Sequence, residues 1–183
     1  WYAYVKDQAD RILEKEVPVY TISEGRLLDV SNDMVSRALY LGFTYQMTKD
    51  ERYAQKLYAD LEAVCSFEDW HPDHTLDTGS MSAAVAIGFD WIYETLTEEQ
   101  RQFIAERAKR NGLGPIRANF YGSATYSTTF WANTETNWAV WVCGNSAMLA
   151  MALAEYDMDF CMDFLRNAYC CMEKMWYAFA PDG

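Results

Sequence analysis

An asparagine stands directly before a tryptophan at Asn137-Trp138, where a helix rich in small and apolar residues begins. A neutral amide donates hydrogen bonds to an anion without titrating, and an indole offers a flat apolar face to a sugar ring. This pairing predicts a carbohydrate cleft in which Asn137 binds an anionic group and Trp138 stacks on the sugar. The alternatives are a helix N-cap for Asn137 and a core position for Trp138. Asn145, two turns further on, is expected to lie too deep to reach a ligand.

The only histidines, His71 and His74, lie three residues apart in a polar and aromatic loop. We predict that both line the same cleft and that Trp70 provides a second stacking surface. A hydrogen bond to a helix end is the alternative for each histidine. Two histidines at this spacing beside loop carboxylates are common by chance, so the prediction is no bound metal and no other cofactor. Tyr126, in an irregular segment rich in Ser and Thr, is a further candidate for ligand contact.

Two aspartates could support a different chemistry. Asp90 lies inside an apolar stretch, where a buried carboxylate has either a catalytic role or a fixed partner. Together with Asp77 it would suit a glycoside hydrolase, which needs two carboxylates flanking the bond that is cut. We favour a packing role for Asp90 and a role at a helix start for Asp77.

The composition limits the partners. The 183 residues carry a formal net charge of −12, and no basic stripe is present to neutralise phosphates, which argues against nucleic acid. No apolar run reaches the length that a membrane span requires, which argues against a membrane. The five cysteines lack the spacing of a disulfide framework or zinc site. We predict buried free thiols, which favours a reducing compartment such as the cytoplasm.

Helical periodicity runs along almost the whole chain, and no convincing strand is found. Helices that are apolar all round alternate with amphipathic ones, and an apolar helix must be buried between others. The predicted fold is all-α: antiparallel helical hairpins in two layers that form part of an α/α toroid, with no sheet. A helical solenoid would look similar, but the hairpins share no consensus residues at a fixed period. The predicted helices are 32–47, 50–64, 76–96, 98–111, 115–121, 137–155 and 158–179.

Four blocks follow one another along the chain, at residues 28–53, 69–78, 84–99 and 137–155, and Ala180-Pro181-Asp182-Gly183 closes the series. Their order and spacing resemble the α/α-toroid domain of heparinase II/III-like polysaccharide lyases, which include alginate, oligoalginate and heparin-type lyases. One departure is Gly79-Ser80, where family members commonly carry Ala-Glu. This departure leaves the subtype of the substrate open.

The resemblance implies a carbon–oxygen lyase that cleaves a uronate-containing glycan by β-elimination, with an acidic polysaccharide or oligosaccharide as its partner. Asn137 matches the family's asparagine that neutralises the uronate carboxylate. In the family, the catalytic tyrosine and histidine and a β-sandwich domain lie after the segment that resembles this chain. We therefore expect residues 1–183 to form one partial toroid domain, truncated at the C-terminal end and nearly inactive alone. Family members are periplasmic or secreted, so the compartment stays open.

Two other classes of function remain open. One is a toroid glycoside hydrolase or sugar epimerase, in which Asp90 or Asp77 would serve as acid or base. The other is a non-catalytic helical scaffold that binds proteins, which would have no concave cleft rich in Trp and His.

Overall fold

The computed structural model describes residues 1–124 and 130–176, so the candidate Tyr126 lies outside the described residues. The described part is helical, and its only extended pairing is an isolated bridge between Ser23 and Arg26. The prediction of an all-α fold without a sheet is confirmed for these residues. The helices are α1 (Tyr2–Leu13), α2 (Leu28–Thr48), α3 (Glu51–Cys65), α4 (Thr75–Ile92), α5 (Glu98–Ala108), α6 (Gly114–Phe120), α7 (Asn137–Ala152) and α8 (Met158–Glu173), with shorter helical turns η1 (Tyr93–Thr95), η2 (Lys109–Leu113) and η3 (Phe130–Asn133).

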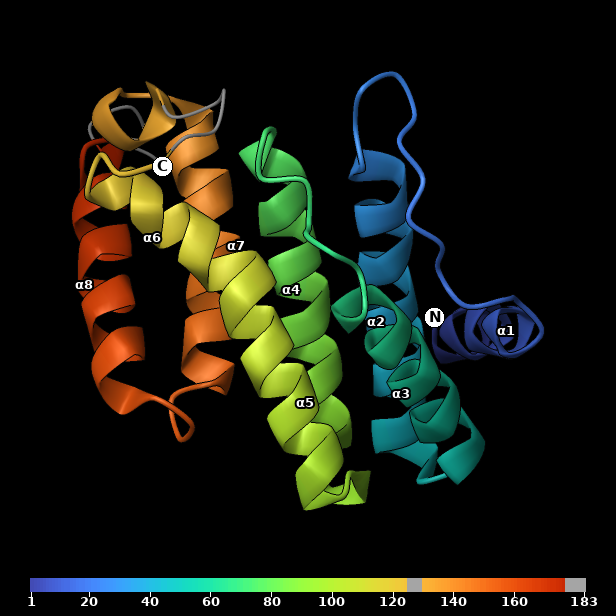
Figure 1. The fold of residues 1–183 in the computed structure, drawn as a ribbon. Helices are drawn as coiled ribbons and strands as arrows, with labels where there is room; N and C mark the ends of the chain where they lie inside the picture. Colours follow the sequence, from blue (N-terminus) through green and yellow to red (C-terminus); the bar gives the residue numbers. More distant parts are fainter. Residues whose placement is uncertain (125–129, 177–183) are drawn as a thin grey trace.

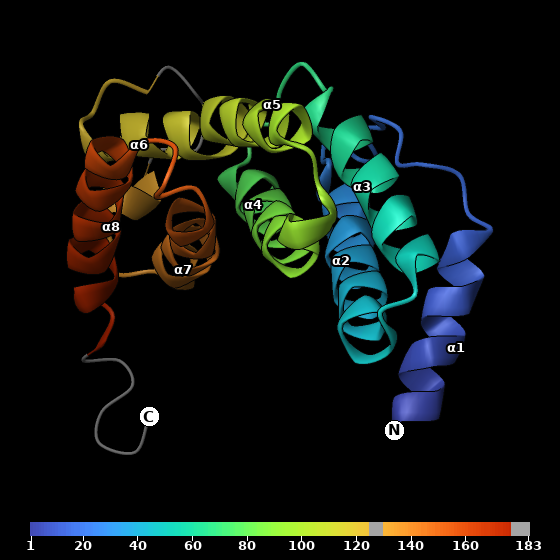
Figure 2. The ribbon, with the colours of Figure 1, turned by 90° about the horizontal axis from the view of Figure 1, so that it is seen from below.

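The helices form a two-layered arc. Helices α2, α4 and α7 lie side by side as an inner layer, with α4 packed against both neighbours. Helices α3, α5, α6 and α8 follow the outside of the arc, and α1 lies at the end next to α2 (Figure 2). The three inner helices run in the same direction, so their N-termini lie at one end of the molecule (Figure 1). The two layers of antiparallel hairpins agree with the arrangement that the alternating helix types predict.

Small residues bring the inner helices close together. A Cβ atom on Gly79 of α4 would lie 3.3 Å from the Cα atom of Val142 in α7. On the other side of α4, a Cβ atom on Gly42 of α2 would lie 2.6 Å from the Trp91 ring. Larger side chains at these two positions would push the helices apart. Such close approach explains why α4 is buried on almost every side, as its apolar sequence predicts.

Local capping signals place two helix starts as the sequence predicts. Thr97 and Gln100 form a capping box: the Gln100 backbone N–H donates to the Thr97 hydroxyl at 3.3 Å, and the Thr97 N–H donates to the Gln100 side chain at 2.9 Å. At the start of α3, the Asp50 carboxylate accepts from the backbone N–H of Arg52 at 3.1 Å. Both contacts join residues that are close in sequence.

The predicted end of the helix at Asn111-Gly112 is wrong. The chain instead continues through the π-helical turn η2 into α6. A Cβ atom on Gly112 would lie 2.7 Å from the Trp70 ring and 2.9 Å from a methyl carbon of Leu149. Gly112 is therefore required for close packing and not for a left-handed helix end.

Two expectations from composition concern the membrane and the cysteines. Within residues 1–124 and 130–176, no helix combines the length and the apolar character that crossing a bilayer demands. All five thiols are free, and four of them are buried, as predicted. Cys170 is the exception, because it lies on the exposed face of α8.

Candidate functional site

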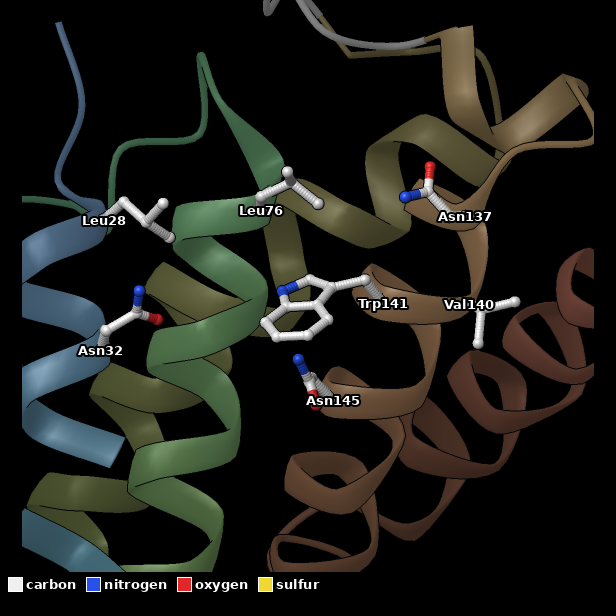
Figure 3. A pocket seen from close by; sticks show the side chains of 7 residues that line it. All are labelled: Leu28, Asn32, Leu76, Asn137, Val140, Trp141 and Asn145. Atoms are coloured by element: carbon white, nitrogen blue, oxygen red, sulfur yellow. The ribbon is translucent and has the colours of Figure 1, made fainter. Parts of the chain in front are cut away.

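A hollow of about 590 Å³ opens on the inner layer near the N-terminal ends of α2, α4 and α7. In Figure 3 the hollow faces the viewer, and α5 and α6 lie behind the inner helices. The hollow therefore opens away from the outer layer. We call this hollow the amide pocket, because three asparagines contribute to its wall. Its lining residues are Leu28 and Asn32 from α2, Leu76 from α4, and Asn137, Val140, Trp141 and Asn145 from α7.

Helical spacing explains why these residues face the same space. Asn137, Trp141 and Asn145 follow one another at intervals of four, so they lie on one stripe of α7. The Trp141 side chain is 49% exposed, and its indole extends over α4 between the two asparagines (Figure 3). The arrangement offers a flat apolar face with an amide group on each side of it.

Asn137 lies at the start of α7 with its side chain exposed. It is the first residue of α7, and Thr136 occupies the N-cap position without a capping hydrogen bond from its side chain. The alternative role of Asn137 as the N-cap is therefore wrong. The residue is exposed, and its amide has no hydrogen-bond partner among the described residues. The first turn of a helix carries a partial positive charge, which favours an anion beside this amide.

Asn145 and Asn32 were not expected in the site. The prediction that Asn145 lies too deep is wrong, because its side chain is half-buried and lines the amide pocket. Asn32 reaches the same pocket from α2 and is exposed. The spacing of four between Asn137, Trp141 and Asn145 could have identified the α7 residues. The sequence alone gives no comparable signal for Asn32, because it lies on a separate helix.

A buried carboxylate fixes the segment that precedes α2. Asp77 accepts hydrogen bonds from Arg26 at 2.6 and 3.1 Å and from the backbone N–H of Leu27 at 2.8 Å. The Nδ1 atom of His71 lies 2.9 Å from the same carboxylate. These contacts tie the chain before α2 to the first turn of α4, and Leu28 follows directly as a wall of the amide pocket. Asp77 thus has a positioning role, which goes beyond the helix start predicted for it.

Neither histidine lines the amide pocket, so the prediction that both do is wrong for this pocket. His71 is held by Asp77, and the His74 ring packs against Trp138 with 4.7 Å between ring centres. Burial, followed by the positive charge of Arg26, lowers the pKa of His74 below its usual value. His74 therefore binds a proton less readily than a free histidine, and it is not among the residues that line the pocket.

The two tryptophans predicted as stacking surfaces are packed against protein. Trp138 is half-buried between His74 and Phe130, with 5.1 Å between the centres of its ring and the Phe130 ring. Trp70 is fully buried, and its Nε1 atom donates to the backbone oxygen of Val64 at 2.8 Å. The prediction for Trp70 is wrong, and Trp141 has the position in the pocket that was expected of Trp138.

The two aspartates considered for a hydrolase do not form a catalytic pair. Asp90 is exposed near the C-terminal end of α4, which corrects the expectation that it is buried. It follows Asp77 by 13 residues, which corresponds to about 20 Å along a helix. The carboxylates of glycosidases lie within about 5–9.5 Å of each other. Among the described residues, no group of three or more His, Cys, Asp or Glu side chains is arranged to hold a metal ion.

Neither a scan of protein-family models nor a search of curated proteins finds a match to this chain. The resemblance to heparinase II/III-like lyases therefore rests on the four sequence blocks alone.

Proposed function

We propose that this chain belongs to a lyase that cleaves a uronate-containing glycan by β-elimination, and that the amide pocket binds the uronate. The observation that carries the proposal is the exposed amide of Asn137 on the wall of the amide pocket, which has no hydrogen-bond partner among the described residues. The neighbouring Trp141 supplies an apolar face for the sugar ring, and Asn145 supplies a second amide from the same helix.

The chemistry explains why an amide is suited to this position. The enzyme must remove the proton on C5 of the uronate and expel the oxygen linked to C4. While the carboxylate keeps its full charge, the C5 proton is too weakly acidic. A hydrogen bond from the Asn137 amide stabilises the negative charge that develops on the carboxylate oxygens, and one such donor is worth roughly 10²–10³ in rate. The partial positive charge at the start of α7 acts in the same direction.

The role of this chain is binding and charge neutralisation. Among the described residues, no tyrosine or histidine lines the amide pocket, so none of these lining residues is suited to act as the general base or acid. The resemblance implies that these groups come from later parts of the complete protein. Asp77 and Asp90 do not replace them, because Asp77 is bound by Arg26 and Asp90 is at the other end of α4.

Binding is the direct test on residues 1–183. The titration uses oligouronates that have no unsaturated sugar at their end and is monitored by tryptophan fluorescence and calorimetry. It should show saturable binding, and a neutral glucan oligosaccharide should not reproduce this binding. Asn137→Ala should weaken it by about tenfold or more, the value expected for a hydrogen bond to a charged group. Asn133→Ala is the matched control, because Asn133 is exposed in η3 and does not line the pocket. Equal binding by the Asn137 and Asn133 variants would contradict the proposal.

Turnover is the test on the complete protein. A lyase creates an unsaturated uronate that absorbs ultraviolet light, whereas a hydrolase releases reducing ends without that absorbance. Incubation with alginate, heparan sulfate and chondroitin separates these classes and identifies the glycan. Asn137→Ala should lower turnover by roughly 10²–10³-fold. Full turnover by this variant would exclude the neutralising role.

A further inference from the structure

A second hollow, of about 400 Å³, lies where α1, α2 and α4 meet. We call it the aromatic hollow. Trp1 at its edge is 85% exposed, and Tyr4 is 60% exposed. The Trp1 ring stands nearly perpendicular to the Phe43 ring, with 5.3 Å between ring centres and an angle of 79° between the planes. The residues that matter for its chemistry are Trp1, Tyr4, Ser36, Tyr40, Phe43 and Trp91.

The aromatic hollow and the amide pocket share one face of α2. Asn32 lines the amide pocket, and Ser36, Tyr40 and Phe43 line the aromatic hollow at steps of four, four and three residues. This spacing keeps all four side chains on one side of the helix. Asn32 and Phe43 are separated by about 16 Å along α2, from the rise of an α-helix. The inner layer is open on the side away from α5, and the start of α1 projects to that same side (Figure 2).

The chemistry of the aromatic hollow fits a sugar. Its walls are ring faces and edges, and the hydroxyl groups of Ser36, Tyr4 and Tyr40 provide hydrogen-bonding positions between them. A sugar ring has an apolar face of C–H groups and a polar edge of hydroxyls, which match an aromatic wall and its hydroxyl rim. Among the described residues that line the hollow, no side chain is charged, so these side chains suit a neutral part of the sugar better than the carboxylate.

We infer that the aromatic hollow is a further sugar-binding subsite for the same oligosaccharide whose uronate occupies the amide pocket. This inference rests on the proposed function. A chain of several sugar units spans the stretch of α2 between the two hollows, while a disaccharide in the amide pocket does not. Affinity should therefore rise with the length of the oligosaccharide, and the aromatic residues should be responsible for the increase.

The test is a binding series with residues 1–183, using an oligouronate disaccharide, tetrasaccharide and hexasaccharide. The hexasaccharide should bind more tightly than the disaccharide. Trp1→Ala and Tyr4→Ala should each weaken hexasaccharide binding by about three- to tenfold, the value of one aromatic contact, and leave disaccharide binding unchanged. Both residues are largely exposed, so neither change should disturb folding. Trp176→Ala is the matched control, because this exposed tryptophan lies beyond α8.

The outcomes separate this inference from the proposed function. Equal affinity for all three lengths, or equal loss for disaccharide and hexasaccharide in the variants, would overturn the subsite while the amide pocket remains supported. No binding of any oligouronate by the unmodified chain would overturn both. Sedimentation of the free protein supplies a further check. A dimer that dissociates in the Trp1→Ala variant would show that a second copy of the chain, and not a sugar, covers the hollow.

Discussion

The substitution Asn137→Asp separates binding from stability, because the two should change in opposite directions. Asn137 is the first residue of α7, is exposed, and has no hydrogen-bond partner among the described residues. An aspartate at this position interacts favourably with the positive end of the helix dipole. The free energy of unfolding should therefore rise by about 0.3–1 kcal/mol.

The same change should strongly weaken the binding of a uronate. It removes an amide donor, and a hydrogen bond to a charged group is worth about 1.5–3 kcal/mol. It also places two negative charges about 4 Å apart, which costs about 1 kcal/mol at the dielectric constant of water and more in a partly enclosed pocket. The smallest sum is about 2.5 kcal/mol, or roughly a sixtyfold loss of affinity. Asn137→Ala removes only the donor, so its effect should be the smaller of the two.

The measurement pairs urea unfolding with titration of an oligouronate, monitored by the fluorescence of Trp141 and the other tryptophans. Added salt should recover part of the affinity of the Asp variant, because it screens the repulsion between the charges, and should not do so for the Ala variant. The reasoning is refuted if the Asp variant binds the oligouronate as tightly as the unmodified protein. It is also refuted if the loss of binding is accompanied by a comparable loss of folding stability.

Three further substitutions and one control test the packing and the protonation of residues around the site. Asp77→Asn should lower the free energy of unfolding by about 2–3 kcal/mol, somewhat less than for a fully buried pair, because Arg26 remains 29% exposed; an unchanged urea midpoint would contradict this. Gly112→Ala should destabilise by about 1–3 kcal/mol, because its Cβ atom would lie 2.7 Å from a buried ring. Gly144→Ala in α7 is the matched control: its nearest contact would be 3.9 Å, and it should stabilise by about 0.5–1 kcal/mol. The lowered pKa of His74 means that the unfolded chain binds a proton near pH 6.5 while the folded protein does not, so stability should fall as the pH drops below 6.5. Urea unfolding of the His74→Gln variant should show a smaller decrease in stability between about pH 7 and about pH 5 than the unmodified protein shows. An identical decrease in stability would argue against the protonation of His74 as its cause.

The helical part of the fold could be predicted because most of its determinants are local. The capping box of Thr97 and Gln100 and the cap at Asp50 involve residues two or three positions apart. The start of α2 was predicted four residues too late, at Asn32, because its determinant is not local. The Leu27 N–H group that precedes α2 is bound by Asp77, which lies fifty residues further along the chain. No capping pattern within α2 contains that information.

The candidate site could be predicted only in part, for a related reason. The type of a residue indicates what it can bind, but the packing of its helix decides which way it points. Trp138 and Trp141 are equally plausible stacking surfaces by composition, and they differ by three positions on α7. The structure packs Trp138 against His74 and turns Trp141 into the amide pocket. Trp70 is buried because Gly112 leaves room for its ring.

Gly79 connects the packing of α4 to the geometry of the amide pocket. A Cβ atom at this position would lie 3.3 Å from the Cα atom of Val142 and 3.6 Å from the Trp141 ring. A larger residue would therefore shift α7 away from α4 and move the indole at the same time. Because Asn137 and Asn145 share a stripe of α7 with Trp141, both amides would move with it. The distance between the α7 amides and Asn32 on α2 thus depends on a glycine that does not line the pocket, and the sugars that fit between them depend on it as well.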